Sequence, residues 1–429
     1  MTAESRSERI FATYWIETAY PLEQAAEMMA GEQSTGTFLR VPGETDDLRE
    51  CFAACVESIT ELEDTATASL PGAGVPKNWD GRRRTAEVVL SWPLHNIGAS
   101  LPNLLATVAG NLSELKPFSG LKLTDLALPP SFLSAYQGPQ FGVAGTRAFT
   151  GVYDRPLIGT IIKPSIGQTP EATAEQVRVL AEVGVDFIKD DELQSDGPHC
   201  PFRERVTAVQ AVLNRYADRT GKRVMYAANM TGDIEQMLDR LEHIETNLGT
   251  CAMVSMNSIG LPAMKIVRKH AKVVIHGHRN GWGMLGRSPA IGMSFVAFQK
   301  LWRLAGIDHT HVNGLRNKFC ESDESVIASA LACLTPIFPE PYPGCTVMPV
   351  FSSGQSVDQV ADTYAALGGT DLIYACGGGI MGHPMGAAAG VRSLRQAWEA
   401  AVEGIPLAHF ARTHPELKAA LEFFGRGTN

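Results

Sequence analysis

The sequence predicts an α/β protein in which a C-terminal (βα)8 TIM barrel follows a smaller α+β N-terminal domain, and three observations lead to this fold class. From residue 157 onward, short apolar runs rich in β-branched residues alternate with segments whose apolar residues recur at helical spacing. Eight such strand–helix units end near residue 405, and a barrel of this kind needs roughly 250 residues. Residues 1–140 lack that alternation, so we expect them to form a separate domain.

The eight predicted barrel strands are short apolar runs. In chain order they cover Leu157–Lys163, Val185–Lys189, Arg223–Ala228, Cys251–Met256, Lys272–His276, Asp308–His311, Thr346–Phe351 and Asp371–Ala375. Helices are expected between them, most clearly over residues 172–183, 204–216, 234–248 and 357–367. A doubly wound open sheet is the rival arrangement. Eight units, the last followed by a long Ala-rich helix over Met385–Glu403, favour a closed barrel.

The N-terminal region has a different pattern. Strands are predicted at Ile10–Thr18 and Thr85–Trp92, with a helix at Leu22–Met29 between them. The Gly/Pro-rich segment Gln137–Gly145 is typical of a connector. We therefore assign residues 1–140 to the α+β domain and residues 150–429 to the barrel domain.

Composition excludes several classes of function. The 429 residues include 37 Lys+Arg and 46 Asp+Glu, so the formal net charge is −9, which disfavours nucleic acid and anionic membranes as partners. The one dense basic run, Arg82–Arg84, is interpreted as a solvated face. The sequence shows no secretory pattern near its start and no apolar stretch of about 18 residues, so we expect a cytoplasmic protein. The eight cysteines include no C-x-x-C pair, which disfavours a zinc site.

Polar, cationic or glycine residues follow every predicted barrel strand. In a closed parallel barrel, catalytic groups come from the C-terminal ends of several strands and from the loops that follow them. In chain order these residues are Lys163; Lys189 to Glu192; Asn229; Asn257; His276, His278 and Arg279; His311; Ser352 to Gly354; and Gly377 to Gly379. The coincidence at all eight ends predicts a catalytic site at this mouth of the barrel.

A magnesium site is expected after the second barrel strand. A charged run is usually a solvated turn, but the one that includes Asp191 and Glu192 directly follows an apolar run and therefore lies at the barrel mouth. Adjacent carboxylates suit a hard divalent cation such as Mg²⁺.

Candidate anion-binding residues follow the later strands. The glycine triplet that starts at Gly377, together with Gly354, occupies the usual phosphate corner, where bare backbone N–H groups approach phosphate oxygens. Arg279 and His311 are candidates for holding a second anionic group. Lys318, in the loop after the sixth strand, is a candidate flexible cation, although a lone lysine is more often simply solvated.

With these residues placed, the chain resembles the large subunit of ribulose-bisphosphate carboxylase (RuBisCO), and specifically its non-carboxylating relatives, the RuBisCO-like proteins. The matching motifs occur in family order and cover nearly the whole chain. They are Glu32–Phe38 (EQSTGTF), Ala109–Asn111 (AGN), Gly159–Pro164 (GTIIKP), Asp186–Glu192 (DFIKDDE), His276–Arg279 (HGHR), His309–His311 (HTH), Pro349–Gly354 (PVFSSG) and Gly377–Pro384 (GGGIMGHP).

The resemblance implies a role for each matching catalytic residue. Lys189 would be carbamylated by CO2, and its carbamate would bind Mg²⁺ together with Asp191 and Glu192. Lys163 would be the acid/base next to the enediolate, and His278 would contact hydroxyl or carbonyl oxygens of the substrate. Mg²⁺ and CO2 are therefore the implied cofactors.

The resemblance also implies how a phosphorylated substrate is held and how the chain assembles. Substrate or phosphate binding would fall to Thr37, Asn111, Arg279, His311, Ser352, Gly354, Gly377 and Gly378. In this family the matching N-terminal residues Glu32, Thr37 and Asn111 reach the barrel mouth of the neighbouring subunit. A homodimer, or a multiple of dimers, is therefore implied.

Four departures from the carboxylases matter. Ser165 replaces a second lysine, Trp282 replaces a histidine, and Val312–Gly314 replaces Ser-Gly-Thr. The sequence also stops soon after Phe423–Phe424, without the tail that seals the carboxylase site. We interpret these departures as loss of bisphosphate carboxylation.

Retention of Lys318 favours one reaction among those of the RuBisCO-like proteins. In carboxylases the matching lysine steadies CO2 or the new carboxylate, and an enolase has less use for it. We therefore expect a Mg-dependent decarboxylase of a branched 3-oxo sugar-acid phosphate, of the 3-oxo-isoapionate 4-phosphate type, in which Lys163 protonates the enediolate.

Several other readings stay open. They are transcarboxylation with hydrolysis of the same 3-oxo acid, the enolase or isomerase steps of methionine salvage, an enzyme that uses an unmodified Lys189 as its base, and a sugar-phosphate sensor without activity.

Overall fold

The computed structural model describes residues 8–36 and 41–425. The chain divides into two units, each with its own core. The N-terminal unit comprises the residues up to Gln137 together with two later segments, Gly281–Leu304 and Pro336–Gly344. The barrel unit comprises Gly138–Asn280, Ala305–Thr335 and the residues from Cys345 onward.

A five-stranded mixed sheet forms the centre of the N-terminal unit. Its spatial order is β10–β4–β1–β3–β2. The strands are β1 (Arg9–Thr18), β2 (Cys55–Glu61), β3 (Arg84–Pro93), β4 (Phe118–Ala127) and β10 (Ile291–Met293). The first four pair antiparallel, and β10 joins the edge parallel to β4. The strands predicted at residues 10–18 and 85–92 are therefore confirmed.

Alternating burial along β1 explains why this segment forms a strand rather than a helix. Ile10, Ala12, Tyr14 and Ile16 are all buried and lie two residues apart, which is the period of a pleated strand. The buried Tyr14 hydroxyl donates a 2.6 Å hydrogen bond to the carbonyl of Val108, so its polar end is satisfied.

Short helices complete the N-terminal unit. They are α1 (Leu22–Glu32), α2 (Asp46–Phe52), α3 (Leu101–Val108), α9 (Trp282–Gly286) and α10 (Phe295–Ala305), with 3₁₀ turns η2 (Leu94–Asn96), η3 (Leu112–Glu114) and η4 (Pro130–Ser134).

The interpretation of the basic run Arg82–Arg84 as a solvated face is wrong in part. Arg83 is buried and donates to the Ser119 hydroxyl at 3.2 Å. The run is therefore not a fully solvated face.

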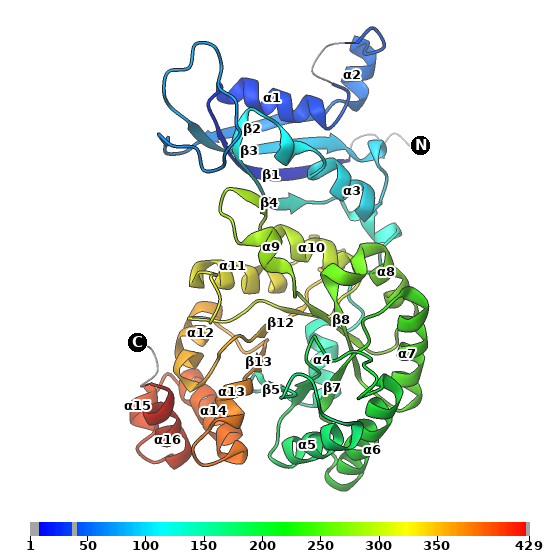
Figure 1. Ribbon diagram of the computed structural model, residues 1–429, viewed down its shortest axis with the longest axis vertical. Coiled ribbons are helices and arrows are strands. Elements are labelled where there is room, and N and C mark those ends of the chain that lie inside the picture. Colours follow the sequence, from blue (N-terminus) through cyan, green and yellow to red (C-terminus); the bar gives the residue numbers. More distant parts are fainter. Residues whose placement is uncertain (1–7, 37–40, 426–429) are drawn as a thin grey trace. The chain divides into compact units, whose positions relative to one another are not determined.

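Eight parallel strands close into a barrel in the second unit, and Figure 1 shows its helices around the outside. The strands are β5 (Leu157–Ile161), β6 (Phe187–Lys189), β7 (Met225–Asn229), β8 (Cys251–Ser255), β9 (Val274–His278), β11 (His309–His311), β12 (Met348–Phe351) and β13 (Ile373–Ala375). Every neighbouring pair is parallel, and β13 pairs with β5, which closes the ring. The predicted barrel is confirmed and the open sheet is excluded.

Apolar side chains fill the barrel interior. The core residues include Leu157, Phe187, Met225, Met253, Val274, Met348, Val350 and Ile373. A filled interior leaves the mouth at the C-terminal ends of the strands as the place for polar chemistry.

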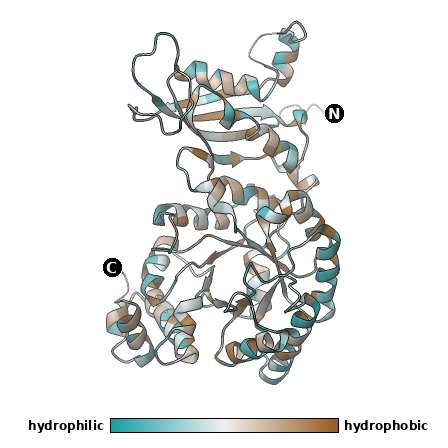
Figure 2. Cartoon of the chain, viewed as in Figure 1, coloured by the Kyte–Doolittle hydropathy of each residue, from teal (hydrophilic) through white to brown (hydrophobic). Residues whose placement is uncertain are grey.

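Helices follow the barrel strands, as the sequence predicts. They are α4 (Gly142–Thr150), α5 (Pro170–Glu182), α6 (Phe202–Thr220), α7 (Ile234–Thr246), α8 (Met256–His270), α11 (Asp323–Leu334), η5 (Val357–Gln359), α12 (Val360–Leu367), α13 (Gly377–Met381), α14 (Ala387–Val402), α15 (Leu407–Phe410) and α16 (Pro415–Phe424). Figure 2 shows hydrophilic and hydrophobic residues along the same helices, the pattern of amphipathic helices with one face on a core.

A buried carboxylate, that of Asp308, connects several elements at the end of the barrel opposite the mouth. Asp308 accepts hydrogen bonds from the backbone N–H groups of Phe141, Gly142 and Ile275 at 2.7–2.9 Å. Its Oδ2 also lies 2.9 Å from Nη1 of the buried Arg268. Asp308 thus ties the start of α4 to β9 and to its own strand β11.

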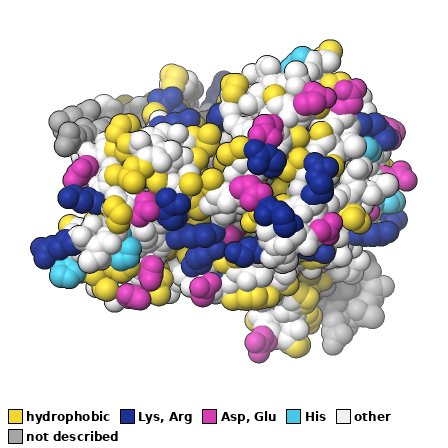
Figure 3. Space-filling model, turned by 90° about the horizontal axis from the view of Figure 1, so that it is seen from below, with side chains coloured by type: hydrophobic (Ala, Val, Ile, Leu, Met, Phe, Trp, Pro, Cys, Tyr) yellow, Lys and Arg dark blue, Asp and Glu magenta, His cyan; other side chains and the backbone are white. Residues whose placement is uncertain are grey.

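Two further findings bear on partners. Among the described residues, no helix is long and apolar enough to cross a membrane. On the face shown in Figure 3, acidic side chains lie among the basic ones.

Candidate active site

Lys189 lies at the end of β6, and its amine is buried. Its side chain is 2% exposed, and Nζ donates to the Asp190 carbonyl at 2.8 Å. Burial lowers the pKa of Lys189 to about 8, although the nearby carboxylates of Glu192 and Asp191 oppose this shift. Near that pH a substantial fraction of the amine is neutral, and only a neutral amine attacks CO2.

The two adjacent aspartates after Lys189 point to different partners. Asp190 is fully buried and accepts from the Tyr226 hydroxyl at 2.6 Å and from Arg205 Nε at 3.2 Å. The backbone N–H of Asn229 completes this set at 2.9 Å. Asp190 therefore holds the loop after β6 against β7 and α6, and leaves Asp191 to face the mouth.

Asp191 forms a compact cluster with Lys163 and Ser165. Lys163 Nζ donates to Asp191 Oδ2 at 2.6 Å and to the Ser165 hydroxyl at 2.7 Å, and that hydroxyl donates to the same carboxylate oxygen at 3.1 Å. Burial alone would raise the pKa of Asp191, but the hydrogen bonds from Lys163 and from the Leu193 backbone bring it below its usual value. Asp191 is therefore an anion at neutral pH.

The residues around Lys189 fit a divalent cation only in part. Lys189 Nζ lies 4.0 Å from Glu192 Oε2, and both Asp191 and Glu192 supply carboxylate oxygens, which hard cations prefer. Among the described residues, no group of three His, Cys, Asp or Glu side chains is arranged to hold a metal ion. A carbamate on Lys189 would add the missing anionic oxygen, so the donor set fits Mg²⁺ once the lysine is modified.

Three neutral histidines connect this cluster to β11 and β12. His278 Nε2 lies 3.5 Å from Glu192 Oε2, and its ring centroid is 4.5 Å from that of His311. His276 and His311 share a 2.9 Å hydrogen bond between their Nε2 atoms, and His311 Nδ1 lies 2.9 Å from the Ser352 hydroxyl. Burial lowers the pKa of His278 to about 3 and those of His276 and His311 well below their usual value. All three are uncharged near neutral pH.

Arg279 is held by an acidic partner that the sequence analysis does not include. Its Nη2 forms an ion pair with Glu321 Oε2, and the same oxygen accepts from Asn313 Nδ2 at 2.6 Å. Asn313 in turn accepts from the Ser353 hydroxyl at 2.9 Å. The loops after β9, β11 and β12 are thereby connected.

Lys318 and the predicted phosphate-binding glycines occupy the loops after β11, β12 and β13. The backbone N–H of Lys318 donates to the carbonyl of Ser353 at 3.1 Å, and a Cβ atom added at Gly354 would lie 3.9 Å from the Lys318 Cβ. Gly354 has a φ of +95°, a conformation that L side chains rarely adopt. Gly377 and Gly378 begin the short helix α13 directly after β13, the strand that pairs with the one leading to Lys163.

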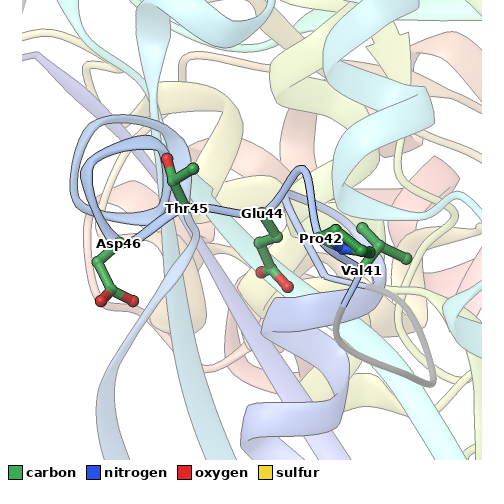
Figure 4. A pocket seen from close by; sticks show the side chains of 5 residues that line it. All are labelled: Val41, Pro42, Glu44, Thr45 and Asp46. Carbon is green, nitrogen blue, oxygen red and sulfur yellow. The ribbon is translucent and has the colours of Figure 1, made fainter.

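The predicted N-terminal residues are described only in part. Thr37 lies outside the described residues. Asn111 is exposed in the N-terminal unit, at the start of η3. That unit also contains an open hollow lined by Val41, Pro42, Glu44, Thr45 and Asp46, which Figure 4 shows along one stretch of chain. None of these five is a predicted site residue, and we assign the hollow no function.

Family comparison covers both units of the chain. The model of the ribulose bisphosphate carboxylase large chain, catalytic domain, matches residues 142–424, and that of the N-terminal domain matches residues 3–132. The chain belongs to the ribulose bisphosphate carboxylase large-chain family. The resemblance inferred from the motifs is therefore confirmed.

Individual members of the RuBisCO family match nearly end to end. The 3-oxo-isoapionate-4-phosphate transcarboxylase/hydrolase of Xanthobacter autotrophicus is 53% identical over 97% of this chain and 100% of its own length. The 3-oxo-isoapionate-4-phosphate decarboxylase of Rhizobium rhizogenes is 44% identical over 97% and 99%. The crystal structure of a rubisco-like protein from Burkholderia fungorum has 46% identity and a TM-score of 0.91, covering 97% of this chain and all of that one.

Sequence reasoning does not single out four residues that contact the candidate site residues. In the sequence Asp190 is one member of an acidic run, and Ser165 stands out only as a departure from the carboxylases. Asn313 likewise stands out only as part of such a departure. No pattern in the sequence singles out Glu321, because its contact with Arg279 joins loops 42 residues apart.

Proposed function

We propose that this chain is an enzyme acting on 3-oxo-isoapionate 4-phosphate, or on a closely related branched 3-oxo sugar-acid phosphate, at the bond to the carboxyl group. The observation that carries the proposal is the 53% identity, over 97% of the chain, to the transcarboxylase/hydrolase of this substrate. The decarboxylase relative at 44% identity acts on the same compound by name, so two relatives support this substrate and differ in outcome.

The chemistry of a 3-oxo acid explains what the site must do. When the carboxylate leaves as CO2, the electron pair of the broken C–C bond stays behind and moves into the neighbouring ketone, which produces an enediolate. A divalent cation held by a Lys189 carbamate, Asp191 and Glu192 would supply positive charge where that enediolate forms. The chain's own residues must then position the substrate for cleavage of the bond to the carboxyl group and supply the proton that follows.

Lys163 is the residue that we assign to proton transfer. Its ammonium group is half exposed at the mouth and is held at 2.6 Å from Asp191 and 2.7 Å from Ser165. In decarboxylation it would give a proton to the carbon that lost the carboxyl group, and solvent would reprotonate the amine.

Substrate positioning falls to neutral and cationic groups around the mouth. His278 is uncharged, so its imidazole offers one N–H donor and one acceptor to substrate hydroxyl or ketone oxygens. The backbone N–H groups at Gly354, Gly377 and Gly378 would hold the phosphate. Lys318, beside Gly354, would steady the carboxyl group during cleavage or transfer.

Of the two outcomes, transcarboxylation followed by hydrolysis has the stronger support, because the relative of that name shares 53% identity with this chain against 44% for the decarboxylase. Decarboxylation stays the second candidate. Both begin with the same bond breaking, so Lys318 and Lys163 serve either reaction.

A carboxyl label separates these outcomes. 3-Oxo-isoapionate 4-phosphate labelled with ¹³C at the carboxyl carbon is incubated with enzyme, Mg²⁺ and unlabelled bicarbonate, and the products are followed by NMR in D2O. A label that stays in an organic acid supports transcarboxylation and hydrolysis. A label that moves to bicarbonate, with deuterium in the ketose product, supports decarboxylation.

If the protein does not turn over 3-oxo-isoapionate 4-phosphate, another function must be assigned. Turnover of a diketo-alkyl phosphate or of methylthioribulose phosphate, run in parallel, would move the protein to the enolase and isomerase steps. Tight binding of a sugar phosphate without Mg²⁺ and without turnover would support a sensor.

We propose a homodimer, or a multiple of dimers, as the working assembly. The support is family membership together with the position of Asn111 outside the barrel unit. The mass of the protein in solution, measured by light scattering, tests this assembly.

A further inference from the structure

Arg279 and Glu321 form a largely buried ion pair in the barrel unit, at the end of β9. Their side chains are 7% and 15% exposed. In an exposed pair both groups would be screened by water, and the pair would open easily. Here the two charges face each other with little water around them, so separating them would leave each charge poorly solvated.

Glu321 is fixed from several sides. Its Oε2 accepts from Asn313 as well as from Arg279, and its Oε1 accepts from the Ser325 hydroxyl at 2.9 Å. Its own carbonyl accepts from Asn317 Nδ2 at 3.1 Å. Both oxygens of the carboxylate are therefore hydrogen-bonded, so an anion that displaced Glu321 would have to break several contacts at once.

Glu321 offsets the positive charge with which Arg279 would attract a phosphate. The positive charge of Arg279 is matched by Glu321, and the neighbouring His311 is uncharged because it is buried. A phosphate dianion bound to Arg279 would lie next to the Glu321 carboxylate, and like charges in a poorly hydrated site repel strongly. The end with Gly354 differs, because its neighbour is a lysine: the Lys318 Cβ lies 3.9 Å from where a side chain at Gly354 would begin, and the backbone N–H of Lys318 donates to the Ser353 carbonyl.

We propose that Glu321 is a specificity-determining residue that excludes a second phosphate, so that the site takes a substrate with one phosphate at the Gly354 end and hydroxyl groups at the Arg279 end. This inference rests on the proposed function for the substrate class, a phosphorylated sugar acid. It replaces the expectation that Arg279 and His311 hold an anionic end of the substrate.

Hydroxyl groups suit the Arg279–Glu321 pair better than an anion does. An alcohol donates to a carboxylate and accepts from a guanidinium, so it engages both members of the pair without breaking it. A phosphate only accepts from Arg279 and gains nothing from Glu321.

Two ligands that differ by one phosphate group test the proposal. Ribulose 5-phosphate and ribulose 1,5-bisphosphate are titrated by calorimetry into the full-length protein with Mg²⁺ and bicarbonate. We expect the wild-type protein to bind the bisphosphate no more tightly than the monophosphate. Glu321→Gln, which keeps the shape and removes the charge, should bind the bisphosphate at least tenfold more tightly and change its monophosphate affinity less than threefold.

The matched control is Glu324→Gln, which removes the same charge from an exposed position three residues further on. It should leave both affinities unchanged. A general effect of net charge on phosphate binding would change both variants alike and would overturn the assignment to Glu321.

Other results would also overturn the proposal. Wild-type protein that binds the bisphosphate more than tenfold tighter than the monophosphate would show that Arg279 leaves Glu321 for a phosphate. This comparison needs no variant, so it decides the question even if Glu321→Gln does not fold.

The titrations with the monophosphate and with the bisphosphate measure binding and do not depend on turnover. Loss of the proposed function would appear in the labelling experiment alone, while failure of this inference would appear in the affinity ratio alone.

Discussion

The Lys163 ammonium donates a 2.6 Å hydrogen bond to Oδ2 of Asp191, so the group assigned to proton transfer is bound to a group assigned to metal binding. A cation that takes Asp191 as a ligand would compete with Lys163 for the same carboxylate oxygen. Metal binding and release of Lys163 toward the substrate are therefore coupled in the proposed mechanism, and Ser165 is positioned to keep the amine at the mouth.

The first prediction follows from this pair. Lys163→Met should lower kcat by roughly 100- to 10,000-fold, because a positioned proton donor contributes about that much to catalysis. It should leave Mg²⁺ binding intact or tighter, because Asp191 loses its competing partner. Asp191→Asn should instead weaken Mg²⁺ binding. Metal affinity is measured by calorimetry at saturating bicarbonate, and equal loss of Mg²⁺ binding in both variants would contradict the coupling.

Carbamylation of Lys189 is the second prediction. Burial gives this lysine a pKa of about 8, against an ordinary value of 10.5, so the neutral amine becomes abundant as pH rises through 8. The rate of activation by preincubation with CO2 and Mg²⁺ should therefore rise from pH 6.5 and level off above about pH 8. Activation is followed by dilution into assay buffer at one fixed pH.

The same lysine separates two mechanisms. Lys189→Arg cannot form a carbamate and should show no activation at any pH. Full activity of wild-type protein in CO2-free buffer would support instead an unmodified Lys189 that acts directly as a base.

The pKa of Lys189 also predicts a dependence of stability on pH. Its folded pKa lies below its unfolded value, so between about pH 8 and 10.5 the unfolded chain binds the extra proton. The free energy of unfolding should therefore rise with pH across this window in the absence of CO2. Lys189→Met should remove that increment, which urea unfolding at several pH values measures.

Lys318 is the third prediction. An electrostatic contact to the carboxyl group in the transition state is worth about 100-fold in rate, so Lys318→Ala should lower kcat on the 3-oxo acid by about that factor. Enolisation of a substrate that lacks the carboxyl group should be affected much less. Lys418→Ala, which removes an exposed lysine on helix α16, is the control for charge. Unchanged turnover of every substrate by Lys318→Ala would remove the argument from this lysine.

The sequence predicts the barrel and the position of most candidate residues because both follow from local patterns. Each apolar run is short, and the polar residue after it necessarily lies at the mouth once the barrel closes. Which of Asp190 and Asp191 faces the mouth is not local in this sense, because it depends on Tyr226 and Arg205, which come from other elements.

The pairing of Arg279 with Glu321 also lies beyond sequence reasoning. An arginine next to a histidine at a strand end is typical of an anion site, and the acid that cancels its charge comes from a loop two strands later. The buried Arg83 is a similar case, since only the folded sheet brings Ser119 to it. Charges in loops acquire their function from packing, and a linear pattern does not record that packing.

The base of the barrel supplies the fourth prediction. Asp308 satisfies three backbone N–H groups and the buried Arg268, so Asp308→Asn leaves an unpaired charge in the interior. Removing one partner of a buried pair typically costs about 3–5 kcal/mol. We expect a loss of that size in urea unfolding. Glu175→Gln, which breaks the exposed pair with Arg178, should have no measurable effect.

The fifth prediction tests whether the active site is shared between subunits. Asn111→Ala and Lys189→Met should each be nearly inactive, the first through a partner's site and the second through its own barrel. When the two variants are co-expressed, half of the dimers are mixed, and in each mixed dimer one barrel with Lys189 meets an N-terminal unit with Asn111. About a quarter of the wild-type activity should therefore return, by the symmetry of a two-fold dimer. Activity that stays at the level of the single variants would place Asn111 in the same subunit's site or outside any site.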